Sequence, residues 1–241
     1  MDVFVATSRG RGLEEYFSIK SRTAISVLPG GLLEDLTEEA EKLLVSNLHK
    51  YEDVQDLHPN FVYVLGELPD LTEKVKDRNY LEIIYNESTT TTTPKMITKL
   101  LAADQKIKSL NAIPCFSTIS PMSLDTWNHH RLYTNKTSYL VHHHHYSDMN
   151  HLLNESIMDI NNFIMDLNNI NNVETPNFAA SIITKRGKGR DYRIKYNKLV
   201  DGCHPTKDVI KKWTVDLDII TSNNRYRNAT KEALADFFRP K

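Results

Sequence analysis

The sequence has few cysteines, no long apolar run and almost no net charge, and each of these absences excludes a class of protein. Its 241 residues include only two cysteines, Cys115 and Cys203. Two thiols are too few for a disulfide framework, which favours a reducing compartment. No stretch approaches the roughly 18 apolar residues that a membrane-spanning helix needs. A formal net charge of -1 provides no global field that would commit the chain to nucleic acid or to a membrane surface.

The N-terminal stretch MDVFVATSRGRG lacks the basic region and the long apolar region of a signal peptide. We therefore expect a cytoplasmic protein. In so Asn-rich a sequence without a secretion signal, we interpret the Asn-x-Ser/Thr sequons as chance. The four sequons begin at Asn86, Asn135, Asn154 and Asn228.

What the sequence does contain is an alternation of short apolar runs with longer amphipathic segments. Its composition, 40% hydrophobic and 25% charged, is that of a globular protein with a substantial core. Runs rich in Val, Ile and aromatic residues predict five buried strands. These strands cover residues 2–6, 23–28, 61–65, 113–119 and 178–183. Apolar residues at helical spacing predict long helices within 32–44, 98–110, 152–167 and 209–220.

Strands that alternate with helices of this length predict βαβ units and a parallel sheet. We expect one three-layer α/β domain over residues 1–241, with about five parallel strands in the order 2-1-3-4-5 and helices on both faces. Three stretches do not follow this pattern. The threonine run 89–93, which ends at Pro94, predicts a surface loop, and the run NNINN at 168–172 predicts a polar helix end. The segment 134–148 predicts a mobile loop, and its four adjacent histidines, 142–145, are poorly spaced for a tetrahedral metal site.

The residues that follow the expected strands are the candidates for function, because ligands bind at the carboxyl ends of strands in an open parallel sheet. Ser8 follows the first strand, the turn Pro29-Gly30-Gly31 follows the second, and the segment 66–70 follows the third. Asp201-Gly-Cys-His204 follows the last strand. Together they supply the parts of a serine hydrolase: a nucleophile, oxyanion donors, a base and a carboxylate that orients the base.

Each of these residues also has a purely structural explanation. A serine at a strand-to-helix turn most often caps the helix, and Gly30 and Gly31 suit any tight turn. Pro205 is typical of the first position of a helix, which leaves His204 as an ordinary turn residue. Taken singly, the structural explanation is the commoner one. Their joint placement at one edge of one sheet favours the catalytic interpretation.

At these positions the sequence resembles the SGNH, or GDSL-type, hydrolase superfamily, nearly from end to end. The Gly-Asp-Ser block of that family corresponds to Ala6-Thr7-Ser8, with Gly10-Arg11-Gly12-Leu13 behind it. The stretch PGGLLEDL at 29–36 is similar to the second block, and Gly66 to Asp70 corresponds to the third, Gly-x-Asn-Asp. The strongest match is Asp201 to Pro205, which reproduces the fifth block, Asp-x-x-His-Pro.

The resemblance implies a flavodoxin-like fold and hydrolysis of a carboxylic ester by a triad of Ser8, His204 and Asp201. It implies oxyanion donors at Ser8, Gly30 and Gly66, a small-molecule, glycan or lipid ester as the substrate, and no cofactor or metal. Thr7 replaces an aspartate that does no chemistry. The third-block asparagine is absent, because Leu68 or Pro69 stands there. Losing one oxyanion donor typically costs about 10² to 10³ in rate, so we expect weak activity.

A basic stretch at 185–198, KRGKGRDYRIKYNK, suggests an alternative function. It carries seven Lys and Arg residues against one Asp, with Tyr192 and Tyr196 interleaved, a composition typical of a nucleic-acid or polyanion surface. An exposed hairpin balanced by acidic residues elsewhere explains it equally well. The alternative is therefore an SGNH-like module that has lost catalysis and binds nucleic acid or another acidic partner. The candidate contacts are Arg186, Lys188, Arg190 and Arg193.

Overall fold

The central element of the fold is a four-stranded parallel sheet. The computed structural model describes residues 1–13, 22–48, 59–66, 68–77, 80–85, 89–135, 146–185 and 192–237. The strands are β1 (Asp2–Ala6), β2 (Thr23–Val27), β3 (Asn60–Leu65) and β6 (Ala112–Phe116), in the order β2-β1-β3-β6. Ala6 lies opposite both Val27 and Leu65. The carboxyl ends of these three strands are therefore level, and the residues that follow them emerge at one edge.

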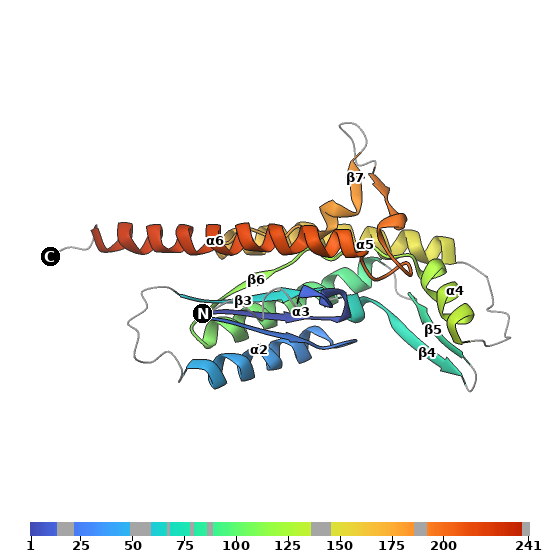
Figure 1. Ribbon diagram of the computed structural model, residues 1–241, viewed down its shortest axis with the longest axis horizontal. Helices are drawn as coiled ribbons and strands as arrows, with labels where there is room; N and C mark the ends of the chain where they lie inside the picture. The colour runs from blue at the N-terminus through green and yellow to red at the C-terminus, as the bar shows by residue number, and fades with distance from the viewer. Residues whose placement is uncertain are drawn as a thin grey trace.

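Helices cover both faces of the sheet, as a three-layer α/β fold requires (Figure 1). Helices α2 (Leu33–Leu48) and α3 (Thr89–Ser109) lie on one face, with α5 (Tyr146–Ile170) beside α3. The long helix α6 (Lys207–Phe237) lies on the other. Along β1, Val3 and Val5 enter the core on the α2 and α3 side, whereas Phe4 and Ala6 enter the core under α6. Because both faces are covered, β1 and β3 are apolar on both faces after their first residue.

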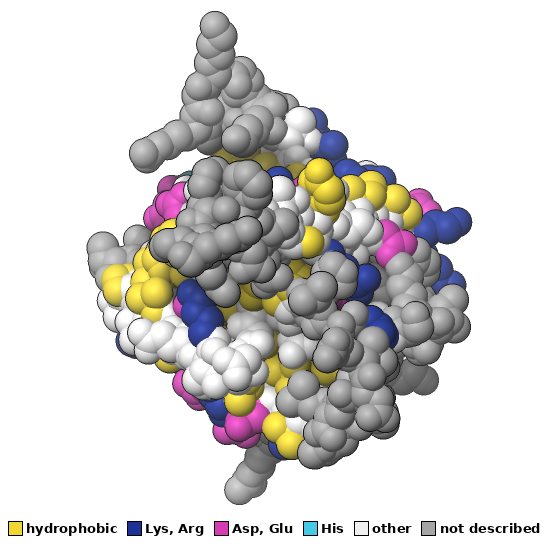
Figure 2. Space-filling model, turned by 90° about the vertical axis from the view of Figure 1, so that its left-hand side faces the viewer, with side chains coloured by type: hydrophobic (Ala, Val, Ile, Leu, Met, Phe, Trp, Pro, Cys, Tyr) yellow, Lys and Arg dark blue, Asp and Glu magenta, His cyan; other side chains and the backbone are white. Residues whose placement is uncertain are grey.

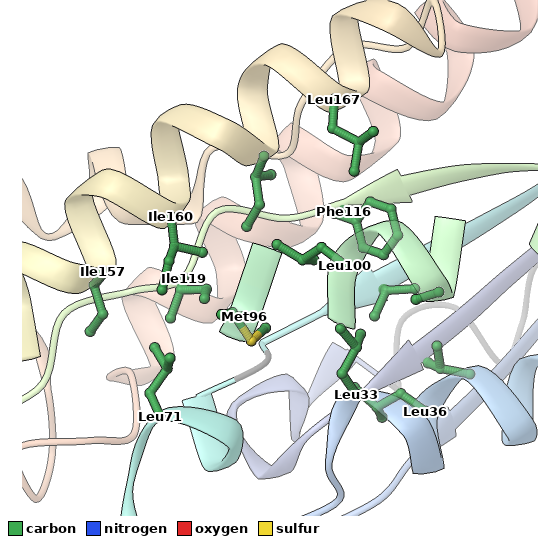
Figure 3. Packing of buried hydrophobic residues seen from close by; sticks show 14 of the residues in the cluster. Leu33, Leu36, Leu71, Met96, Leu100, Phe116, Ile119, Ile157, Ile160 and Leu167 are labelled. Atoms are coloured by element: carbon green, nitrogen blue, oxygen red, sulfur yellow. The ribbon is translucent and has the colours of Figure 1, made fainter. Parts of the chain in front are cut away.

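The core on the α2 and α3 side is built from aliphatic side chains of three helices (Figure 3). Leu33 and Leu36 of α2 and Leu100 of α3 are fully buried there. Ile160 of α5 is buried in the same cluster. The core under α6 contains more aromatic residues, and in it the rings of Phe178 and Trp213 stack with centroids 4.2 Å apart.

The remaining elements are short, apart from one further helix, and they lie outside the sheet. They are η1 (Ser8–Gly10), η2 (Leu68–Leu71), β4 (Glu73–Asp77), β5 (Tyr80–Ile84), α4 (Leu124–Asn135), η3 (Phe178–Ser181), β7 (Ile183–Lys185), β8 (Tyr192–Ile194) and η4 (Tyr196–Lys198). β4 pairs with β5, and β7 pairs with β8, each antiparallel. The β7–β8 pair overlaps the stretch 185–198 that we expect to form a hairpin, and it projects from the body of the molecule (Figure 1).

Two expectations from the sequence are wrong. Residues 178–183 do not form a fifth sheet strand: they begin with η3, and only Ile183 belongs to a strand, β7. Asn177 caps η3 by accepting a hydrogen bond from the amide of Ala180. The apolar side chain of Phe178 packs on the ring of Trp213. The threonine run 89–93 is the beginning of α3 and not a loop. Pro94 lies inside this helix as its sixth residue, where its missing N–H removes one helical hydrogen bond.

Two observations concern the apolar and charged residues of the described part of the chain. None of its helices combines the length and the apolar character that crossing a bilayer demands. Among the coloured residues on the face at the amino ends of the strands, Lys and Arg side chains are interspersed with Asp and Glu (Figure 2). Residues 136–145, which include the four histidines, lie outside the described residues.

The segment from Cys115 to Leu124 is completely buried, although only its first two residues belong to a strand. Buried backbone outside a sheet needs other hydrogen-bond partners. Three asparagines of α5 provide them, each accepting from the amide and donating to the carbonyl of one residue of the segment. Asn168 pairs in this way with Phe116, Asn161 with Ile119, and Asn154 with Met122.

The spacing of these asparagines matches the two backbones. Seven residues of α-helix rise about 10.5 Å, and three residues of extended chain span about 9 to 10 Å. Asparagines that recur every seven residues along a helix can therefore form hydrogen bonds with every third residue of an extended segment. Asn154 and Asn228, which begin two of the sequons, are buried, so neither is accessible for glycosylation in the folded protein.

Replacing Asn161 with alanine should lower the free energy of unfolding by about 2 to 4 kcal/mol, because it leaves the buried amide and carbonyl of Ile119 without partners. The neighbouring Asn162 is exposed and provides a matched control. Asn162→Ala should change stability by less than about 0.5 kcal/mol. Urea unfolding followed by circular dichroism measures both, and equal stabilities of the two variants would contradict the role assigned to Asn161.

Candidate active site

Ser8 is the first residue of η1 and is separated from the end of β1 by Thr7 alone. This short helix has Thr7 as its N-cap residue, with no side-chain capping bond, so the Ser8 hydroxyl does not serve as the cap. The Ser8 Oγ lies 3.1 Å from Nε2 of His204. The turn needs glycine at position 10, because a Cβ on Gly10 would lie 2.4 Å from the Cβ of Ala6.

Asp201 and His204 lie in one loop just before α6. An isolated bridge between Leu199 and Pro205 closes this loop. The Asp201 Oδ1 accepts from the amides of Cys203 and His204, at 3.0 and 2.7 Å. Its Oδ2 lies 2.7 Å from Nδ1 of His204. An ionised carboxylate can only accept, so Nδ1 carries the proton and Nε2 is left as the acceptor that faces Ser8.

The environment of Asp201 keeps it ionised. Burial acts to raise its pKa, but the hydrogen bonds from the His204 ring and amide, the charge of the His204 ring and the bond from the Cys203 amide outweigh burial. Together they lower the pKa of Asp201 from 3.8 to about 2. The carboxylate therefore stays charged at neutral pH and holds the His204 ring in a single tautomer.

The predicted oxyanion donors lie at the ends of three neighbouring strands. Gly30 has a φ of +76°, a conformation that glycine adopts without strain. The Gly66 amide already donates to the Ser117 Oγ at 3.2 Å, inside the protein. We therefore keep the amides of Ser8 and Gly30, and not that of Gly66, as the candidate donors.

Asp70, the last residue of the third block, has a structural role. Its side chain is fully buried, and its Oδ2 accepts from the amide of Leu33 at the start of α2. The Asp70 Oδ1 accepts from Lys99 Nζ at 2.7 Å. The Asp70 carboxylate is thus engaged at the α2 end and is not a catalytic group in this structure.

One aromatic and one basic residue without a recognisable signal in the sequence lie beside the triad. The rings of Trp127 and His204 have centroids 5.5 Å apart, and the guanidinium carbon of Arg131 lies 5.1 Å from the centre of the Trp127 ring. Both residues belong to α4, a helix whose weak apolar pattern gave no signal in the sequence. They follow each other at i and i+4, which places them on one side of the helix.

A buried arginine holds the nucleophile turn against the segment 115–124. Arg9 donates through Nη1 to the carbonyl of Ser120 and through Nη2 to that of Pro121. Its Nε has no hydrogen-bond partner among the described residues. Because the asparagines of α5 fix that segment, Arg9 fixes the position of Ser8 relative to it.

The basic hairpin contributes little that can be placed at this site. Arg193 lies on β8 and is exposed, while Arg186, Lys188 and Arg190 lie outside the described residues. Within the described ranges, no three His, Cys, Asp or Glu side chains gather as a metal site would require.

The comparisons with known proteins identify the fold. No protein-family model and no curated protein matches the sequence. Among solved structures, a candidate acylhydrolase from Bacteroides fragilis is similar over 93% of this chain and 88% of its own, with a TM-score of 0.57 and 11% identity. A GDSL-like lipase from Bacteroides thetaiotaomicron is similar over 96% and 88%, with a TM-score of 0.51 and 9% identity. An acetyl xylan esterase is similar over 90% and 98%, with a TM-score of 0.51 and 13% identity. The chain therefore has the fold of the GDSL-type, or SGNH, hydrolases, as its sequence blocks predict.

The low pKa of Asp201 has a consequence for stability. A carboxyl group with a pKa of about 3.8 in the unfolded chain and about 2 in the folded protein stabilises the fold above pH 4. That contribution is lost as the pH falls towards 2. At about 1.4 kcal/mol for each pKa unit, it amounts to about 2 kcal/mol. Between pH 5 and pH 2.5, the free energy of unfolding of Asp201→Asn should therefore fall less steeply than that of the wild type. Parallel pH profiles in denaturant titrations would contradict the hydrogen-bonded carboxylate.

Proposed function

We propose that this protein is a serine hydrolase that cleaves a carboxylic ester through Ser8, His204 and Asp201. The observation that carries the proposal is the continuous pair of contacts from Ser8 Oγ to His204 Nε2 and from His204 Nδ1 to Asp201 Oδ2. It joins residues almost 200 positions apart in the chain. The arrangement supplies a nucleophile, a base and an orienting carboxylate in the geometry that acyl transfer needs.

The reaction follows from these positions. His204 Nε2 takes the proton of Ser8 as Oγ forms a bond to the ester carbonyl carbon. The negative charge that develops on the carbonyl oxygen is received by the amides of Ser8 and Gly30. The tetrahedral intermediate then expels the alcohol, which leaves with the proton from His204. Water repeats the two steps on the acyl-enzyme and releases the acid, so that Ser8 and His204 return to their starting states.

We expect turnover to be slow. The third-block position holds Leu68 or Pro69, neither of which donates from its side chain, and the Gly66 amide is engaged by Ser117. The candidate oxyanion donors are therefore the two backbone amides of Ser8 and Gly30. In the family that the sequence resembles, the third block adds an asparagine side-chain amide to these donors. Losing one donor typically lowers kcat by about 10² to 10³. Activated esters with good leaving groups are accordingly the substrates of choice for assays.

Covalent labelling tests the nucleophile. A fluorophosphonate probe should label the wild-type protein at one site and leave Ser8→Ala unlabelled, as intact-mass spectrometry reports. Ser46 is an exposed serine on α2, and Ser46→Ala should label like the wild type. His204→Ala should slow labelling by about 10³-fold or more, because no base then removes the Ser8 proton. Equal labelling of wild type and Ser8→Ala would remove Ser8 from its role and leave the basic hairpin as the better candidate for function.

A further inference from the structure

Helix α4 is fixed to the loop that carries Asp201 and His204. The amide of Ser123 donates to the carbonyl of Gly202 at 2.7 Å. Gly202 has a φ of +82°, and a Cβ on it would lie 2.7 Å from the Ser123 carbonyl oxygen and 2.9 Å from the Trp127 amide nitrogen. The loop therefore packs directly on the first turn of α4 without an intervening side chain. This contact places the side chains on this side of α4 next to the loop that carries His204.

Trp127 and Arg131 form a wall beside the triad on this side of α4. Trp127 lies against the His204 ring, and the Arg131 guanidinium lies over the Trp127 ring. A guanidinium over the face of an indole is attracted by the ring and keeps N–H groups that can donate to an anion. Arg131 is half-buried, which strengthens its attraction for a negative charge relative to full exposure.

No acidic side chain of the described residues forms an ion pair with Arg131. The nearest carboxylate along the helix, Asp125, pairs with His129 at 3.3 Å. The triad carboxylate, Asp201, is occupied by His204 and two amides. Among the side chains that the structure describes, the positive charge of this wall therefore has no ion-pair partner.

The positions of the oxyanion donors and of the proton donor decide which half of an ester lies beside Trp127 and Arg131. The carbonyl oxygen turns towards the amides of Ser8 and Gly30, whereas the alcohol must lie near His204 to receive its proton. Trp127 contacts His204, so the wall borders the alcohol half of the substrate and not the oxyanion site. We propose that Arg131 binds a negatively charged group on the alcohol half of the ester, and that it thereby selects esters of anionic alcohols. This inference rests on the proposed hydrolase function.

A pair of matched acetate esters tests the selection. 4-Acetoxyphenylacetate and 4-acetoxyphenylacetamide differ in charge, and a methylene group insulates their leaving phenols from that difference. Both form the same acetyl-enzyme, so the ratio of their kcat/KM values reports the acylation step alone. We expect the wild type to favour the anionic ester by about tenfold or more, the range of a charge-assisted hydrogen bond. Ser8→Ala gives the background to be subtracted.

Two substitutions of Arg131 and one control complete the experiment. Arg131→Met keeps an apolar stem on Trp127 without the charge and should bring the ratio close to one. Arg131→Lys, which keeps the charge, should retain part of the preference. Lys207 is an exposed cation three residues after His204, and Lys207→Met should leave the ratio unchanged.

The outcomes separate the two proposals. A ratio near one in the wild type, or a ratio that Arg131→Met does not lower, overturns the role of Arg131. In either case Ser8-dependent hydrolysis of both esters still supports the hydrolase. If neither ester is hydrolysed in a Ser8-dependent way and the fluorophosphonate probe does not label Ser8, the hydrolase proposal fails and the role of Arg131 fails with it.

Discussion

The hydrogen bonding of one buried extended segment, residues 115–124, is the constraint on which the rest of the structure depends. Its backbone leaves the sheet at Phe116 and still passes through the interior, where unpaired amides and carbonyls are costly. Asn154, Asn161 and Asn168 of α5 satisfy it at every third residue. The segment in turn fixes Ser8 through Arg9 and the Asp201 loop through Ser123. The geometry of the candidate site therefore depends on side chains of a helix that contributes no candidate catalytic residue.

The charges at the site are arranged so that one proton has a defined position. Asp201 is ionised because His204 and two backbone amides donate to it. The proton of the imidazole is then on Nδ1, and Nε2 faces Ser8 ready to accept. The His204 ring also lies beside Trp127, with the ring centroids 5.5 Å apart. The guanidinium of Arg131 lies over that indole, so the triad, the Trp127 ring and a positive charge follow one another along this wall.

The third block shows how a family pattern can be kept in part for structural reasons. Asp70 remains, but its carboxylate caps α2 and pairs with Lys99. The glycine of the block also remains, because a Cβ on Gly66 would lie 2.8 Å from the Thr7 Oγ1, and its amide is engaged by Ser117. Both residues are thus explained by packing and capping. Only the asparagine, whose place in the block is chemical, has been lost.

The sequence by itself determined the parallel sheet, four long helices and the candidate triad. Period and apolar content reveal buried strands, and the spacing Asp-x-x-His-Pro places a carboxylate and an imidazole in one short loop. The sequence could not show that the apolar run 178–183 begins with a short helix and not with a sheet strand. Phe178 packs on Trp213, and the periodicity of a sequence does not identify the residue against which a side chain packs. Nor could it assign the asparagines of α5, which resemble a solvated face until the buried segment is placed against them. Trp127 and Arg131 belong to the same class: only the packing of Gly202 on α4, a contact between residues about 75 positions apart, brings them to His204.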